Sequence, residues 1–392
     1  MSTARRPASR PRLHRGWLAW VALLAIAASR VTQATPHIPA RDEEVLAALP
    51  RGVAYSADAI RRQSAARLDV AVPLAQFYIS QARTTGDLRF LGYAEALLVH
   101  WRAQTPPIAP VLVMEATILQ SRHAFAAALA QLDQALRAEP GDAQAWLTRA
   151  TVLRVLGRYA EASDSCGHLA AADAVLAQLC AQSLLALNGH LHSAYASILA
   201  LPLASLSNAA RAWRCSELAE MAVRMDDTPA AARWFRAALQ LAPEDVYTRA
   251  AYADLLLLTG RAEATLSLLE GYESAEPMLL RIAIAQQDLN DPRASHSRAL
   301  LASAFSVEEQ RGEAVHRREQ ARFLLDVAHE SSAALSAAQE NWRVQREPAD
   351  VLILLRAAHA AGRPDAAAPA LQFVRQHGLE DARLLPYLES RR

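Results

Sequence analysis

The chain has 392 residues, of which 52% are hydrophobic and 21% charged, and its formal net charge is +1. So much apolar content excludes an intrinsically disordered chain, and a net charge near zero argues against a nucleic-acid-binding protein. The low glycine count of 13 disfavours a β-sandwich or a phosphate-loop enzyme.

Residues 1–34 have the three parts of an export signal. The first fifteen positions hold five arginines and no acidic residue, and an apolar stretch follows from Trp17 to Ala28. That stretch is shorter than the ~20 residues of a relaxed membrane span. Small residues at Thr32 and Ala34 then suit a signal peptidase. We expect a signal peptide that is cleaved after Ala34, with an uncleaved inner-membrane anchor as the alternative.

Helix-breaking residues mark the boundaries of the segments expected in the rest of the chain. Residues 35–66 form a lead-in with a short helix expected from Asp42 to Leu49, and residues 67–105 read as an irregular helical pair. Gln104-Thr105-Pro106-Pro107 is a clear break. We expect a regular helical array over 106–276 and degenerate repeats of it over 277–392.

Two segments of 34 residues, 109–142 and 212–245, repeat one pattern of small, large and turn-forming residues. The matching positions are Ala128 and Ala231, Leu132 and Phe235, Ala135 and Ala238, and Pro140 and Pro243. Segments 143–174 and 246–276, and one near the C-terminus, follow the same spacing. Weaker units are expected over about 67–105, 175–211, 277–310 and 315–347.

This pattern resembles the tetratricopeptide repeat (TPR), in which each unit is a pair of antiparallel helices. The resemblance implies an all-α fold, an α-solenoid in which about eight helix pairs form a right-handed superhelix. One pair cannot bury its own apolar face, so neighbouring pairs must stack to form a continuous core. We expect Trp146 to fill the space between neighbouring helices in that core.

In this family the first helix of each pair lines a concave face that binds protein or peptide segments. Exposed aromatic and arginine side chains often dominate binding energies. A solvated groove without a ligand, with Trp213 or Tyr247 in the core, is the alternative. The absence of lysine, with Thr148 where a carboxylate clamp needs asparagine, disfavours that type of clamp. The family positions carried onto this chain are Thr117, Gln120, Gln144, Thr151, Arg154, Trp213, Glu220, Arg224, Tyr247 and Asp254.

The sequence predicts no catalytic residue, no metal ligand and no cofactor, because it lacks a glycine-rich phosphate loop, HExxH, GxSxG and an Asp-rich metal loop. His190 and His192 read as a polar turn, and His316 and His329 as parts of a solvated face.

The three cysteines are too few for a disulfide scaffold. Cys166 is expected on the second helix of one repeat and Cys180 on the first helix of the next, so the two are the candidate pair for a disulfide. Three buried thiols, Cys215 included, are the alternative.

Two charged stretches depart from the repeat pattern. Residues 301–322 read as a solvated helix face with i,i+4 ion pairs, or as an anion-binding site of Arg311, Arg317 and Arg318. Trp342 is expected under a helix end, with a recognition patch around Arg346 and Glu347 as the alternative.

We therefore predict a non-catalytic periplasmic adaptor that binds a protein or peptide of unidentified sequence. No nucleic acid is expected as a partner, and the membrane only through an uncleaved N-terminal segment. The alternatives are an inner-membrane-anchored regulatory subunit whose repeats face the periplasm, and an enzyme that uses Cys215 or a histidine.

Overall fold

A computed structural model describes residues 67–310 and 316–388. All of these residues belong to one compact unit, within residues 50–392. The predicted signal peptide, its cleavage site and the lead-in helix lie outside the described residues. The domain boundaries drawn from the sequence therefore remain predictions.

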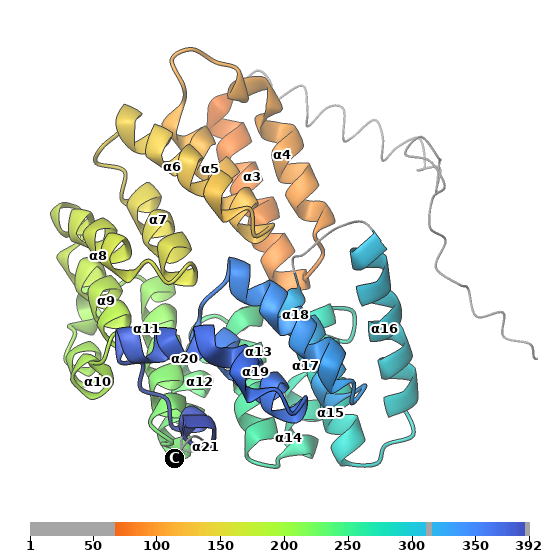
Figure 1. The fold of residues 1–392 in the computed structure, drawn as a ribbon. Helices are drawn as coiled ribbons and strands as arrows, with labels where there is room; N and C mark the ends of the chain where they lie inside the picture. Colours follow the sequence, from red (N-terminus) through yellow and green to blue (C-terminus); the bar gives the residue numbers. More distant parts are fainter. Residues whose placement is uncertain (1–66, 311–315, 389–392) are drawn as a thin grey trace, which may run out of the picture. The chain divides into compact units, whose positions relative to one another are not determined.

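The described residues form helices and short 3-10 turns, without a strand (Figure 1). Helices α3 to α20 follow one another as nine pairs, where about eight were predicted, and the partners of each pair pack together. The all-α prediction is confirmed. The helices are α3 (Leu68–Thr85), α4 (Arg89–Arg102), α5 (Ala109–Ser121), α6 (Phe125–Ala138), α7 (Ala143–Val155), α8 (Tyr159–His168), α9 (Ala174–Leu185), α10 (Leu191–Leu199), α11 (Asn208–Arg224), α12 (Thr228–Leu241), α13 (Val246–Leu258), α14 (Ala262–Leu268), α15 (Glu276–Asp288), α16 (Ala294–Gln310), α17 (Arg317–Asp326), α18 (Ser331–Val344), α19 (Pro348–Ala360), α20 (Ala368–His377) and α21 (Leu385–Leu388).

Helix boundaries follow from local chemistry. Asp142 before α7 and Asp227 before α12 accept hydrogen bonds from backbone N–H groups of the first turn, which would otherwise lack partners. Gly157 ends the first helix of its pair with φ of +72°, a left-handed conformation that favours glycine. A Cβ at this position would lie 2.7 Å from the ring of Phe373. The glycine therefore serves both the turn and a close tertiary contact.

The matched repeat positions are the core of the stack. Ala128, Leu132 and Ala135 are 0% exposed, and the equivalent Ala231 and Phe235 are 0% and 1% exposed. Small residues let two helices approach closely, and the large residue fills the space that remains. The predicted register is therefore correct at these positions.

Trp146 differs from its prediction because it is only partly buried. Its ring stacks on that of His168 with centroids 3.9 Å apart, and its Nε1–H donates to the carbonyl oxygen of Pro140 at 2.8 Å. The side chain therefore packs against the edge of the core and is not enclosed by it.

The first helices of successive pairs contact one another along the whole described chain, from α3 through every odd-numbered helix to α19. We call these helices the first-helix row. No helix of the described segments is both long and apolar enough to cross a membrane.

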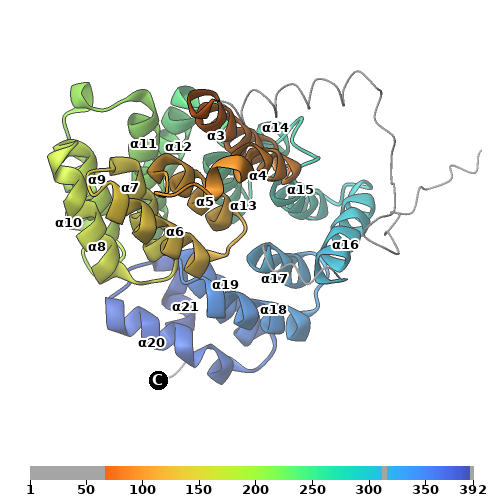
Figure 2. The same ribbon diagram turned by 90° about the horizontal axis from the view of Figure 1, so that it is seen from above.

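Helices near the C-terminus pack against α6 to α8, a contact that a simple stack does not contain. Figure 2 shows the blue helices α19 and α20 beside α6 and α8, and one core cluster holds residues of all four. The Arg346 N–H donates to the carbonyl oxygen of Val155 at 2.8 Å. The ring of Tyr159 meets those of Phe373 and His377 at 5.9 and 4.7 Å.

Candidate functional site

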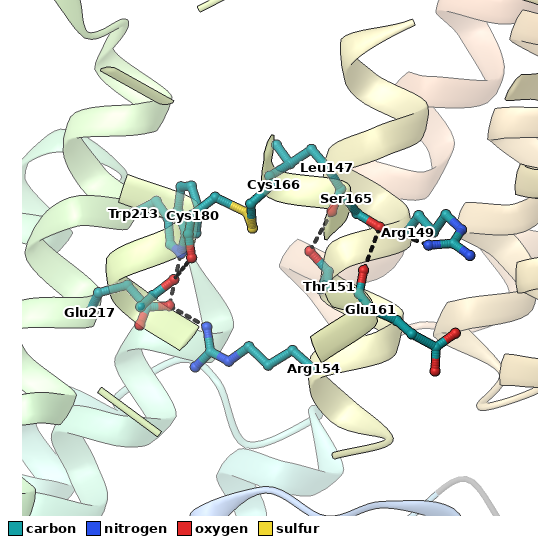
Figure 3. The surroundings of a disulfide bond; sticks show 11 residues. Leu147, Arg149, Thr151, Arg154, Glu161, Ser165, Cys166, Cys180, Trp213 and Glu217 are labelled. Atoms are coloured by element: carbon teal, nitrogen blue, oxygen red, sulfur yellow. Dashed lines mark hydrogen bonds and ion pairs between the residues drawn. A yellow bond between two sulfur atoms is a disulfide. The ribbon is translucent and has the colours of Figure 1, made fainter. Parts of the chain in front are cut away.

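Two residues of the predicted binding set meet where α7 packs near α11, and a third residue holds both (Figure 3). The guanidinium of Arg154 pairs with the carboxylate of Glu217, and the Trp213 Nε1–H donates to Glu217 Oε1 at 2.9 Å. Glu217 is 6% exposed. Glu217 is not among the site residues predicted from the sequence, although it lies one helical turn after Trp213, a spacing at which side chains are neighbours.

Around this pair lies a group of side chains that we call the Glu220 cluster. It consists of Arg154 on α7, Glu217 and Glu220 on α11, Tyr247 on α13, and Glu347, which directly precedes α19. Arg154 interacts electrostatically with each of the other four groups. Glu347 is also paired with Arg318, and Arg224 interacts with Glu217 and Glu220. The cluster is therefore an interior network of opposite charges, and it brings together residues that lie up to 193 positions apart.

Glu220 has an unusual pKa for a carboxyl group. Removal from water and the nearby carboxylate of Glu217 raise the pKa of Glu220 to about 7, although Arg154 and a hydrogen bond from Tyr247 lower it. Removal of its hydroxyl group from water also raises the pKa of Tyr247 far above its usual range. The Tyr247 side chain is nevertheless 55% exposed, so it stays accessible to a partner.

The other predicted residues are divided between surface and interior. Gln144 and Thr151 are exposed, and Thr151 donates to the Leu147 carbonyl of its own helix. Gln120 is half-buried, whereas Thr117 is buried with its hydroxyl bonded to the carbonyl of Val113. Arg224 is buried and donates to the carbonyl oxygen of Ala186 at 2.8 Å. Thr117 and Arg224 are therefore occupied within the fold.

Asp254 belongs to a separate ion network that joins α13, α15 and α17. Its carboxylate pairs with Arg281 at 2.6 Å and with Arg322. Burial raises the pKa of Asp254, but the two guanidinium groups outweigh burial and lower it. Arg322 and Arg356 in turn share Asp326. This predicted residue braces three helices of the first-helix row.

The reading of residues 301–322 as a solvated face is wrong at Arg318. This side chain pairs with Asp350 at 2.6 Å and Glu347 at 2.7 Å, and Asp350 is 1% exposed. Asn341 donates to the same aspartate at 2.7 Å. Arg317 lies 3.3 Å from Glu340. Carboxylates of the chain itself thus occupy the predicted anion site, and Arg311 lies outside the described residues.

The residues of the recognition patch predicted around Arg346 and Glu347 do not lie together. Trp342 is 8% exposed and packs under the helix end as expected, and the Arg346 guanidinium lies 6.0 Å from the centre of its ring. Arg346 is exposed. Glu347 turns instead toward Arg318, so no shared recognition patch forms.

The sulfurs of Cys166 on α8 and Cys180 on α9 are joined in a disulfide (Figure 3). The bond fixes the junction between two consecutive helix pairs. Cys215 is the free cysteine of the described chain and is buried on α11, where burial raises the pKa of its thiol. A protonated, buried thiol is a poor nucleophile.

His316 does not lie on a solvated face, contrary to the sequence analysis. Its Nδ1 is 2.7 Å from Glu308 Oε1 and 3.2 Å from Glu276 Oε1. Among the residues that the structure describes, these three form the group whose ligand atoms could hold a metal ion. Their positions in the sequence form no motif, which explains why they were missed. His329 contacts Gln287, and His190 precedes α10 at an exposed turn.

Comparison with family models and with curated proteins gives no match. Similar solved structures include pilF of Pseudomonas aeruginosa, which is 16% identical over 66% of this chain and 99% of its own, with a TM-score of 0.31. Yeast Tom70 is 12% identical over 85% and 80%, with a TM-score of 0.39. The Cut9–Hcn1 complex of the APC/C is 14% identical over 82% and 68%, with a TM-score of 0.41.

At these scores none of the three proteins informs the function of this chain. The architecture follows from its own helix pairs and from the match between buried positions and the repeat pattern. The fold is a TPR-like α-solenoid.

Proposed function

We propose that this protein is an exported, non-catalytic adaptor that binds a protein or peptide partner along its first-helix row. The observation that carries the proposal is the Glu220 cluster with its exposed Tyr247. Aromatic side chains of this kind supply large contact areas in protein interfaces. The ten residues carried over from the family remain a prediction, and the geometry favours Tyr247 and Glu220 among them.

The charge of the cluster favours a basic partner segment. Burial and the carboxylate of Glu217 raise the pKa of Glu220. A lysine or arginine side chain of a partner would stabilise the ionised form of this carboxyl group. Complementary charge speeds association and selects among partners. We therefore expect a partner segment that places a cationic group beside an apolar one.

In-cell crosslinking through a C-terminal tag, followed by mass spectrometry, tests the adaptor role. The chain offers a matched pair of exposed tyrosines, Tyr247 at 55% and Tyr93 on α4 at 53%. Tyr247→Ala is expected to abolish capture of a specific partner, and Tyr93→Ala is expected to retain it. Arg154 and Trp213 are poorer first choices, because their removal unpairs the buried Glu217.

The outcomes separate three conclusions. Loss of the partner with Tyr247→Ala, repeated with purified components in a calorimeter, supports the Glu220 cluster as the site. Loss with Tyr93→Ala alone moves the site to the first helix pair. Failure to capture any protein contradicts the adaptor role and leaves a small ligand or an enzyme to be considered.

Export to the periplasm of a Gram-negative cell envelope is the second part of the proposal. It is supported by the three-part N-terminal pattern and by the Cys166–Cys180 bond, since disulfides persist mainly in oxidising compartments. Intact mass of the purified protein is expected to correspond to a chain that begins after Ala34. A full-length chain that stays in the membrane pellet after carbonate extraction would establish the anchored regulatory subunit instead.

The non-catalytic part has its own test. Cys215 is buried with a raised pKa, which speaks against a thiolate nucleophile. Cys215→Ala is expected to leave partner capture and cellular function unchanged. Loss of function in this variant, with the fold intact by circular dichroism, would favour an enzyme.

A further inference from the structure

Three helix ends meet at one small cluster of metal-binding side chains. Glu276 opens α15, Glu308 lies in the last turn of α16, and His316 directly precedes α17. One ligand atom from each residue lies within 4.8 Å of the others. The side chains are shielded from most solvent, with exposures of 17% for Glu276, 19% for Glu308 and 20% for His316.

This cluster has more hydrogen-bond acceptors than donors. Nδ1 of His316 lies 2.7 Å from Glu308 Oε1 and 3.2 Å from Glu276 Oε1, yet one ring nitrogen carries at most one proton. The Glu276 oxygen is close enough for charge attraction but is not aligned with a donor. Within residues 67–310 and 316–388 this solvent-shielded oxygen has no hydrogen-bond donor. Such an orphaned acceptor costs free energy unless another cation serves it.

We propose that Glu276, Glu308 and His316 bind a divalent transition-metal ion, with Zn²⁺ as the expected occupant and water as the fourth ligand. Zinc takes imidazole nitrogen at about 2.0–2.1 Å and carboxylate oxygen at about 2.0–2.2 Å in tetrahedral geometry. Ligand atoms in such a site lie about 3.4 Å apart. The two observed nitrogen–oxygen separations therefore need to widen by less than about 1 Å. Calcium and magnesium are disfavoured because they take oxygen ligands.

The surrounding charge favours a dication. Glu319, one turn after His316 on α17, acts electrostatically on both His316 and Glu276. Its carboxylate brings the negative charges near the imidazole to three. His123, just before α6, also lies within electrostatic range of His316. A bound Zn²⁺ would offset the excess of carboxylates and brace the junction of α15, α16 and α17.

The test is a calorimetric titration of the purified full-length chain, without an oligohistidine tag and after removal of metal by a chelator. Zn²⁺ is the first probe, and Co²⁺ is the second because its visible absorption reports tetrahedral coordination. We expect one equivalent of each ion, lost in His316→Ala and weakened at least ~10-fold in Glu276→Gln. The matched control is Glu309→Gln, which changes an exposed carboxylate beside Glu308 and is expected to bind as the wild type does.

Two results would overturn the proposal. Binding that persists unchanged in His316→Ala would assign the ion to other histidines, and absence of binding at every pH would leave a plain ion cluster. If His316→Ala does not fold, the doubly changed Glu276→Gln, Glu308→Gln chain gives the same decision, because it retains side-chain size while removing both charged ligands. Partner capture by the wild type is a separate readout, so failure here leaves the adaptor proposal unaffected.

Discussion

The two ends of the solenoid are held together by different chemistry. Between α5 and α8 the buried positions are mainly small and aliphatic, such as Ala128, Leu132 and Ala150. Between α17 and α19 the interior holds the fully buried Asp350, together with Asn341 and the arginine that pairs with them. An apolar core specifies how closely helices approach, whereas a buried ion network also specifies which side chains must meet.

The largest effect is expected from Arg318→Met. Without the guanidinium, Asp350 and Glu347 remain in the interior as unpaired carboxylates. Breaking a buried pair in this way costs about 3–5 kcal/mol of unfolding free energy. Urea unfolding followed by circular dichroism measures the change. The control is Arg158→Met, whose partner Glu161 is exposed and whose pair is worth about 0–1 kcal/mol. Equal shifts for the two variants would contradict the comparison.

Apolar packing is probed by Phe235→Ala on α12 and by Trp146→Ala on α7. Phe235 is 1% exposed, and its removal leaves a cavity that is expected to cost about 3–5 kcal/mol. Trp146 is partly buried, so its loss removes mainly one hydrogen bond and a stacked ring and is expected to cost about 1–2 kcal/mol. The same urea titrations rank the two. If Trp146→Ala proves as costly as Phe235→Ala, the tryptophan has a core role that its exposure does not show.

A smaller effect is expected from opening the covalent junction between α8 and α9. Cys166 and Cys180 are 14 positions apart, and cross-linking a loop of this length stabilises by about 3 kcal/mol at most, often less. A reductant is expected to lower the urea midpoint of the wild type and of Cys215→Ala by equal amounts. The doubly changed Cys166→Ala, Cys180→Ala chain should not respond to the reductant at all. A response there would mean that reduction acts elsewhere.

The contrast between apolar packing and buried ion networks also explains which features can be predicted from the sequence. Leu132 and Phe235 were placed correctly because a buried apolar face repeats with the period of the helix and of the repeat. Asp142 and Gly157 mark a helix start and a helix end by local chemistry. Information of this kind lies within a few residues, so composition and spacing reveal it.

The ion networks could not be predicted in this way. Arg154 meets Glu217 across 63 positions, and Arg318 meets Asp350 across 32. Nothing in a repeat pattern ties one charged side chain to another that arrives with a different helix pair. The return of α18 to α20 onto α7 and α8 has the same character, since Phe373 reaches Gly157 through the course of the whole chain. Candidate site residues were therefore placed on the right helices, but their partners were not identified.

Two carboxylates of the first-helix row are expected to change stability with pH in opposite directions. The pKa of Glu220 is raised from 4.5 to about 7, so the folded chain binds this proton more tightly than the unfolded chain does. Its contribution to stability therefore falls as pH rises from about 4.5 to about 7. Glu220→Gln is expected to gain stability relative to the wild type over this window and to keep a constant difference above it.

Asp254 supplies the control, because its pKa is lowered from 3.8 by Arg281 and Arg322 despite its burial. The stability that this carboxylate contributes is present above pH 3.8 and is lost as pH falls through its folded value. Asp254→Asn should therefore destabilise the chain at neutral pH and approach the wild type in acid. Thermal unfolding from about pH 2 to pH 8 measures both variants. Parallel pH profiles would show that Glu220 and Asp254 share one environment. A change between pH 4.5 and about 7 for Glu220→Gln, and one below pH 3.8 for Asp254→Asn, would show that burial dominates at Glu220 and ion pairing at Asp254.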